Sequence, residues 1–249
     1  DEAMDIESKE RLKANLEKKL YSLISSELSD LVNLSKSKFK NNYVRALCYQ
    51  LFENNGVIKR EKIHEMIKNI TKEDRLTVRN AGIKIGRYHI FLPRMLKPAS
   101  VYLRIKLWKL YYDEDKKHVI PKSGLNFLKN ETKKNNKFLL ICGFENFNNF
   151  YIRVDILERL FLKILENTKD GTFKIDSDMI NLIGCSKENF YKLLDLMEYK
   201  RKKTKDDKKD DKEDLFVYKP RSLKKGNKKR NNKIDKDNPF EKLSELRFT

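Results

Sequence analysis

The sequence contains few of the residues that end helices and strands, cross-link a chain or bind metal ions. Its 249 residues include 8 Gly, 5 Pro, 3 Cys and 3 His. The cysteines lie far apart and have no Cys or His at zinc-ligand spacing, so we interpret them as reduced, buried thiols and predict no metal site. No run reaches the roughly 18 apolar residues of a membrane span, and no signal-peptide pattern stands at the start. We therefore expect a soluble, cytoplasmic protein that does not engage a membrane.

Motifs for nucleotide binding and catalysis are missing as well. The sequence has no G-x-x-x-x-G-K-S/T loop, no G-x-G-x-x-G fingerprint and no G-x-S-x-G elbow. We predict that this chain alone catalyses no reaction and holds no cofactor. It opens Asp-Glu-Ala-Met-Asp rather than with Met, which we interpret as the start of a fragment of a longer polypeptide.

Positive charge dominates what is present. The 56 Lys and Arg outnumber the 37 Asp and Glu, which gives a net charge of +19. Such a field attracts polyanions, nucleic acid first and anionic membranes second. No acidic residue lies between Asp74 and Asp113, and the interval is rich in cations and aromatic rings. Its basic residues are Arg75, Arg79, Lys84, Arg87, Arg94, Lys97, Arg104, Lys106 and Lys109.

The acid-free interval is the predicted nucleic-acid-binding segment. Basic side chains hold phosphates and aromatic rings accept stacked bases, so single-stranded RNA is the expected partner. We expect Phe91, Trp108 and Tyr111 in the core, Tyr88 and His89 exposed, and the cations at the surface. The candidate contacts, including two from a later helix, are Lys84, Arg87, Tyr88, His89, Arg94, Lys97, Arg104, Lys106, Lys109, Lys187 and Lys192.

The first half of the chain predicts a mainly α domain over residues 5–113. Apolar residues at helical spacing predict helices at residues 6–34, 42–54, 59–69, 71–82 and 98–112. A capping box from Thr71 to Asp74 opens the fourth of these helices. Two short β-rich runs, residues 83–85 and 88–92, predict a small hairpin.

A polar connection over residues 113–136, with one short helix near residues 125–130, is the expected domain boundary. The second module, residues 137–219, is expected to start with two strands, at 138–144 and 151–154. A helix from Asp155 follows, and Gly171 ends it. The remaining elements are an extended piece at 172–175, helices at 178–183 and 187–198, and a hairpin pairing 199–203 with 215–218.

Two short helices joined by a turn that contains Gly, followed by a hairpin, are typical of a winged-helix-like α+β module. Such a unit can be structural, can bind protein or can read DNA, and Glu188 and Asp195 on its second helix oppose a phosphate backbone. Residues 220–249 are expected to be a disordered basic tail with a short terminal motif. Residues 221–233 of this tail hold seven basic residues and no acid. These residues would either bind any polyanion without sequence preference or serve as a flexible end that keeps the chain in solution.

Four short motifs occur in an order that resembles a known family. The first is Gly82-Ile-Lys-Ile-Gly86, followed by a strand, a Leu-Lys-Pro stretch and a helix that ends in Leu-Trp. The other three are Arg153-Val-Asp-Ile-Leu-Glu-Arg-Leu160, Leu182-Ile-Gly-Cys-Ser186 and a Pro-Phe motif within residues 237–246. This order resembles the C-terminal region of DExH-box RNA helicases of the mitochondrial degradosome type, in their bacterial relatives. The resemblance runs from about Leu12 to Leu246.

The resemblance implies ATP-driven unwinding of RNA, with ATP and Mg²⁺ bound only by two motor domains upstream of this chain. The region would then line the exit path of the RNA strand or dock a nuclease. The chain departs from the family in lacking every ATPase motif. Three hypotheses follow: an accessory RNA-binding region of a helicase, a protein-interaction module that docks a nuclease or other partner, and a helix-turn-helix DNA-binding regulator.

Overall fold

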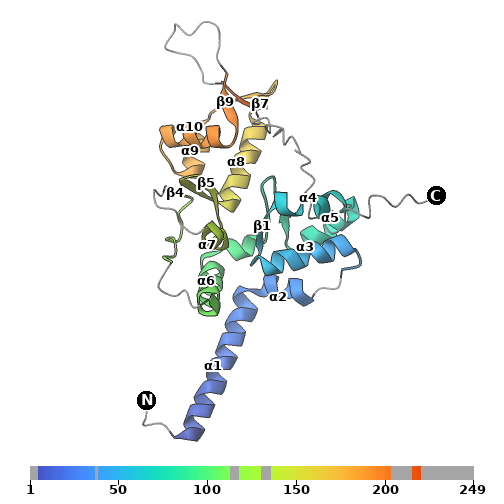
Figure 1. Cartoon of the computed structure of the whole chain (residues 1–249), viewed down its shortest axis with the longest axis vertical. Coiled ribbons are helices and arrows are strands. Elements are labelled where there is room, and N and C mark those ends of the chain that lie inside the picture. The colour runs from blue at the N-terminus through green and yellow to red at the C-terminus, as the bar shows by residue number, and fades with distance from the viewer. Residues whose placement is uncertain (1–4, 37–38, 113–117, 130–135, 203–214, 220–249) are drawn as a thin grey trace, which may run out of the picture. The chain divides into compact units, whose positions relative to one another are not determined.

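The leucine pattern at the start of the chain folds into two helices rather than the single helix expected over residues 6–34. The computed structural model describes residues 5–36, 39–112, 118–129, 136–202 and 215–219. Helix α1 spans Ile6–Glu27 and α2 spans Ser29–Lys36, with a break at Leu28 (Figure 1). Ser and Asp favour helix starts, and Asp30 lies in the first turn of α2. The two helices differ sharply, because α1 buries none of its residues.

Short helices around one apolar core make up the rest of the first part. They are α3 (Asn42–Glu53), the 3-10 turn η1 (Arg60–Ile63), α4 (His64–Lys68), α5 (Lys72–Asn80), the 3-10 turn η2 (Pro93–Leu96) and α6 (Pro98–Tyr112). The capping box predicted at Thr71 is confirmed, since its hydroxyl accepts from the Asp74 amide at 3.2 Å. The core that these helices enclose includes Leu31, Leu47 and Ile90.

A small antiparallel sheet lies against this core. It has the order β1-β3-β2, with β1 at Val57–Lys59, β3 at His89–Phe91 and β2 at Lys84–Ile85. The predicted hairpin is therefore confirmed as β2 and β3. Strand β1 was not predicted, and it occupies the start of the helix that was expected over residues 59–69. The run Val57-Ile58 pairs with β3 instead of continuing a helix.

Two sequence-based expectations are wrong where the second part begins. Residues 127–129 form strand β4 (Phe127–Lys129) rather than a helix, and Asn136–Ile141 forms helix α7 rather than a strand. The apolar run at 138–142 is buried almost throughout, and periodicity alone does not separate a buried helix from a buried strand. The strand predicted at 151–154 is confirmed as β6 (Phe150–Arg153), whereas β5 (Phe144–Phe147) was not predicted beyond its first residue. The sheet has the order β4-β6-β5.

The last described elements follow the expected order, except that the helix expected to run to Gly171 ends at Glu166 and is followed by a strand, β7 (Thr168–Lys169), that was not predicted. They are α8 (Val154–Glu166), β7 (Thr168–Lys169), β8 (Thr172–Lys174), α9 (Ser177–Ile183), α10 (Lys187–Leu196), β9 (Tyr199–Arg201) and β10 (Leu215–Tyr218). Ser186 caps α10 as predicted, accepting from the Asn189 amide at 3.3 Å. The strands form one sheet of order β7-β8-β10-β9, so the final strand, β10, lies between β8 and β9 and pairs with both.

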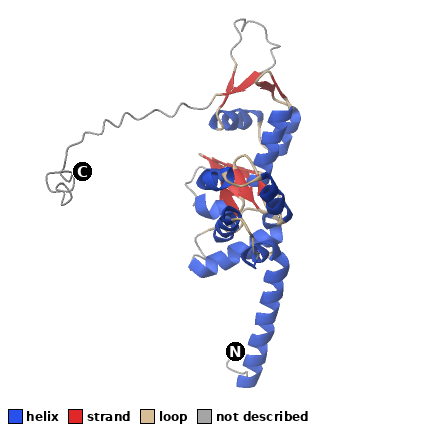
Figure 2. Cartoon of the chain, turned by 90° about the vertical axis from the view of Figure 1, so that its right-hand side faces the viewer, coloured by secondary structure: helices blue, strands red, loops and turns tan. Residues whose placement is uncertain are grey.

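Buried contacts cross the boundary expected near residues 113–136. Trp108 of α6 packs on Phe138 of α7, with ring centroids 5.6 Å apart, in a cluster that also contains Ile105 and Tyr151. The described residues up to Lys219 form one compact unit, and the helices and small sheets confirm a mainly α fold (Figure 2). The predicted tail, residues 220–249, and the hairpin tip, residues 203–214, lie outside the described residues.

No helix within the described ranges is both long and apolar enough to cross a membrane. The described His, Cys, Asp and Glu residues likewise form no group of three that is arranged to hold a metal ion. Of the three large aromatics assigned to the core, Phe91 and Trp108 are buried, which confirms the prediction. Tyr111 is 82% exposed, so its assignment to the core was wrong.

Candidate nucleic-acid interface

The eleven predicted contact residues divide by burial. Exposed side chains belong to Lys84, Arg87, Arg94, Lys97, Lys106, Lys187 and Lys192, and Tyr88 is half-buried. Three others lie in the interior: His89, Arg104 and Lys109 are 1%, 2% and 8% exposed. The expectation of a surface position is therefore wrong for these three. Arg94, although exposed, forms an ion pair with Asp30 at 3.1 Å.

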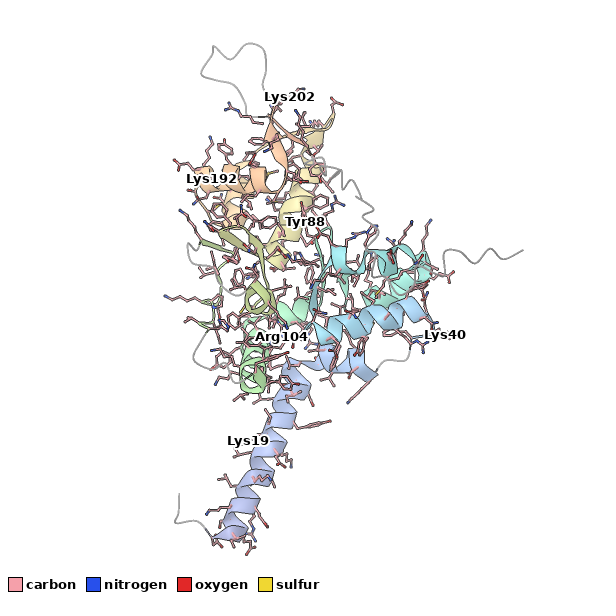
Figure 3. The ribbon with its side chains drawn as sticks, viewed as in Figure 1. Lys19, Lys40, Tyr88, Arg104, Lys192 and Lys202 are labelled. Carbon is pink, nitrogen blue, oxygen red and sulfur yellow. The ribbon has the colours of Figure 1, made fainter. Side chains whose placement is uncertain are left out.

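Arg104 serves the interior of the fold. It lies on the buried face of α6, four residues after Ser100 and four before Trp108, both of which are buried too. Its guanidinium donates to the backbone carbonyls of Asn55 and Met95 (Figure 3). Burial lowers the pKa of Arg104 to about 10. The group holds the η2 turn and the end of α3 together, and no phosphate can reach it in this fold.

His89 is buried because it stands on β3, the central strand of its sheet. Its Nε2 lies 2.6 Å from a carboxylate oxygen of Glu145, and Lys59 forms an ion pair with the same carboxylate. Burial on its own raises the pKa of Glu145. The hydrogen bonds and charges of His89 and Lys59 outweigh burial, so the pKa of Glu145 lies below its ordinary value. These contacts join β1 and β3 to β5 across the expected domain boundary.

A second carboxylate ties the same turn to α8. Glu158, 3% exposed, accepts from three consecutive backbone amides: Arg87 at 2.6 Å, Tyr88 at 2.8 Å and His89 at 2.9 Å. Successive amides that converge in this way form a concave anion-binding nest. Gly86 makes the approach possible, since a Cβ at this position would overlap the Glu158 carboxyl group. We call these contacts the Glu158 latch.

Beside the Glu158 latch lies a groove of about 760 Å³. Its lining residues come from β1, η1, α4, the β2–β3 turn, β5, α8, the end of α10 and the four-stranded sheet. The lining cations are Lys59, Arg60 and Arg87, joined by His64. The lining aromatic residues are Tyr88, Phe147, Phe161, Phe173, Tyr199 and Tyr218. Of the eleven predicted contacts, Arg87, Tyr88 and His89 belong to this groove.

Most of the aromatic residues that line the groove, which we call its aromatic wall, contact one another, although Phe173 and Tyr199 are only 2% and 6% exposed. Tyr88 meets Phe161 of α8 edge to face, with ring centroids 5.9 Å apart, and its hydroxyl hydrogen-bonds to Tyr199. Burial, together with the neighbouring Tyr199, raises the pKa of Tyr88 well above its ordinary value. Tyr199 in turn packs on Tyr218, with centroids 5.4 Å apart. Tyr218 is 46% exposed, so its ring is accessible from solvent.

The cationic wall is held by backbone contacts. Arg60 donates from its guanidinium to the Gly86 carbonyl at 2.8 Å, and its backbone amide donates to the Tyr88 carbonyl at 2.9 Å. The Arg87 guanidinium lies over the Phe161 ring, 5.9 Å from its centroid. Sequence reasoning missed Arg60 because it stands beside Glu61, outside the acid-free interval. The available signal was its position directly after the β-branched pair Val57-Ile58 and a second cation, Lys59.

Comparison with known protein families, with curated proteins and with solved structures finds no match for this chain.

Proposed function

We propose that the chain is the accessory nucleic-acid-binding region of an ATP-dependent RNA helicase, and that single-stranded RNA binds in the groove. One observation carries the proposal: the groove is lined by the cations Lys59, Arg60 and Arg87 together with aromatic residues, among which Tyr218 has an exposed ring. Basic side chains that follow a backbone, combined with rings on which bases stack, are the features by which proteins hold single strands. ATP and Mg²⁺ would be bound by motor domains outside this chain.

Named residues supply each part of the interaction. Arg60 and Arg87 line the groove as cations and would contact phosphates. The accessible ring of Tyr218 would accept a base, and stacking of this kind contributes about 1–3 kcal/mol per base. A base that is paired within a duplex has its faces covered by its neighbours, so the aromatic wall favours unpaired strands. The exposed cations Lys84, Lys97 and Lys106, which lie outside the groove, remain predicted contacts.

We further propose that residues 154–218 are a winged helix. Support comes from the order α8, β8, α9, α10, β9, β10, with the last strand pairing between β8 and β9. The exposed cations of α10, Lys187 and Lys192, are interspersed with Glu188 and Asp195. Lys187 also lies over the Tyr191 ring, 5.7 Å from its centroid. The groove therefore supports strand binding better than α10 supports reading of a duplex.

The proposal is tested by fluorescence anisotropy with single-stranded RNA, the matching DNA and a duplex, at several salt concentrations. Replacing Arg60 and Arg87 with Ala should weaken RNA binding and reduce the salt slope by about 0.7 per lost phosphate contact. Arg79→Ala, an exposed arginine on α5 outside the groove, is the matched control. An equal loss in the control and the groove variants would mean that only net charge matters, and the groove would be abandoned as the site.

Helix α1 favours a second candidate function, a protein-interaction module. Leu12, Leu16, Leu20 and Leu23 are 47%, 57%, 45% and 50% exposed. Apolar side chains gathered on an exposed surface are typical of protein contacts. The variant Leu16→Glu/Leu20→Glu separates the two functions: a docking role for α1 predicts unchanged RNA affinity and loss of association with a purified helicase motor or nuclease partner.

A further inference from the structure

The groove contains a carboxylate that does not fit a purely phosphate-binding role. Glu198 lines it at the junction of α10 and β9. Its backbone has φ 69°, the left-handed region that non-glycine residues rarely adopt. Hydrogen bonds hold it there on both sides, from the Glu198 amide to Asp195 at 3.1 Å and from the Lys219 amide to the Glu198 carbonyl at 2.8 Å. The chain thus keeps a negative charge in a groove that Arg60 and Arg87 also line.

The side chain of Glu198 is oriented by the aromatic wall. The Tyr218 hydroxyl donates to the Glu198 carboxylate at 3.3 Å. Tyr218 is also the accessible ring of the groove. A base stacked on this ring would place its attached sugar beyond the ring edge, which is where the carboxylate stands. Carboxylates accept several hydrogen bonds, so a sugar hydroxyl can bind beside the tyrosine hydroxyl.

The carboxylate repels a phosphate and can accept a hydrogen bond from two kinds of nucleotide donor. N–H groups on a base edge are common to RNA and DNA, whereas the 2′-hydroxyl is present only in ribose. We propose that Glu198 accepts a hydrogen bond from a ribose 2′-hydroxyl and makes the groove select RNA over DNA. The inference rests on the proposed function of the groove as a strand-binding site. The 2′-hydroxyl is the group by which a protein distinguishes RNA from DNA at a given position.

The preference for RNA over DNA has two contributions, one from ribose and one from deoxyribose. With RNA, the Glu198 carboxylate gains a hydrogen bond. With DNA, the same carboxylate faces a C–H group and loses water without replacement, which costs binding free energy. A site built around a hydroxyl therefore rejects the analogue that lacks it. Glu61 also lines the groove, but it is fully exposed and its side chain has no hydrogen bond to an aromatic wall residue among the described contacts.

The experiment measures the affinity of the full chain for a uridine oligonucleotide and for the matching deoxyuridine oligonucleotide. We expect the unaltered chain to bind RNA about 10-fold more tightly, the size of one hydrogen bond to a charged group. In Glu198→Ala the ratio should fall toward one. Removing the charge strengthens binding of both oligonucleotides, so the ratio, and not either affinity, reports the hydroxyl contact. Glu166→Ala, an exposed acid outside the groove, should keep the ratio.

Two further variants keep the test decisive if Glu198→Ala folds poorly. Glu198→Gln keeps the shape and removes the charge, and should give an intermediate ratio. Tyr218→Phe keeps the stacking ring and removes the hydroxyl that orients Glu198, so the ratio should fall while DNA affinity stays the same. An RNA-to-DNA ratio that is unchanged in all three variants would overturn the inference. RNA affinity that is unchanged when Arg60 and Arg87 are replaced with Ala would instead overturn the proposed function.

Discussion

The β2–β3 turn and helix α6 have similar residue composition, but their arginines differ in burial. Both lie in the acid-free interval, and both mix cations with aromatic rings. In the turn, Arg87 is exposed over Phe161 at the edge of the groove. In α6, Arg104 is 2% exposed and its guanidinium is bound to backbone carbonyls. A run of positive charge therefore does not identify a binding surface until burial is known.

The difference has a geometric origin. A tight turn between two short strands projects its side chains away from the sheet, and here the Glu158 latch fixes its backbone. A helix that packs between two cores buries the side chains that face them, and in α6 these include Ser100, Arg104 and Trp108. Any arginine that faces a core must find acceptors inside the protein, because an unpaired buried charge is strongly unfavourable.

The largest effect expected from this comparison concerns Arg104. Arg104→Ala removes a buried cation and leaves the Asn55 and Met95 carbonyls without their partner, which should lower the free energy of unfolding by about 3–5 kcal/mol. Arg87→Ala should change it by less than about 0.5 kcal/mol, as surface substitutions do. Urea unfolding followed by circular dichroism measures both. Equal stability losses would mean that the two arginines do not differ in their surroundings.

A somewhat smaller effect is expected at the Glu158 latch. Gly86→Ala places a Cβ where the Glu158 carboxyl group stands, and we expect a loss of about 2–3 kcal/mol of stability. A double-mutant cycle isolates the cause. If the clash with the carboxylate is responsible, Gly86→Ala should cost much less in a Glu158→Ala background, and strict additivity of the two losses would contradict the latch.

The pH dependence of stability should report the Glu145 contacts. The pKa of Glu145 in the folded chain lies below its ordinary value of 4.5, because His89 and Lys59 outweigh the effect of burial. A carboxyl with a depressed folded pKa contributes stability above its unfolded pKa and loses it as the pH falls through the folded pKa. Stability should therefore drop below about pH 4.5. Glu145→Gln should be less stable at pH 7 and should show a shallower drop in acid than the unaltered chain.

Much of the fold could be predicted from the sequence, because local signals were strong where they were right. The Thr71 capping box, the Ser186 cap and the Gly184 turn each predict where a helix begins or ends, and all three predictions are confirmed. The errors fall where local signals conflict with packing. The helix over 136–141 reads as a strand because its apolar run is buried against α6 and the β4–β6–β5 sheet, and no single-sequence pattern records these neighbours.

The candidate groove was predictable only in part. Charge segregation pointed to Arg87 and Tyr88, which do line it. The other wall comes from residues about 60 to 130 positions later in the chain, such as Phe147 and Tyr218, and depends on the latch between Glu158 and the turn. Pairings over such distances in sequence arise from tertiary packing. The same reasoning misplaced Arg104, because Ser100 and Trp108, four residues away on either side, indicate its buried face only once the helix is placed.

The smallest effect is expected at α10, and it sharpens the distinction between the groove and this helix as the place where nucleic acid binds. Lys192→Ala removes an exposed cation that lies outside the groove, next to Asp195 on the same helix. Screening at physiological salt extends over about 8 Å, so a cation outside the contact region adds little. RNA affinity should change by less than about twofold, whereas Arg87→Ala should lower it several-fold. The ranking is checked in one anisotropy series at fixed salt. A larger loss from Lys192→Ala than from Arg87→Ala would move the interface from the groove to α10 and would favour a helix-turn-helix that contacts a duplex.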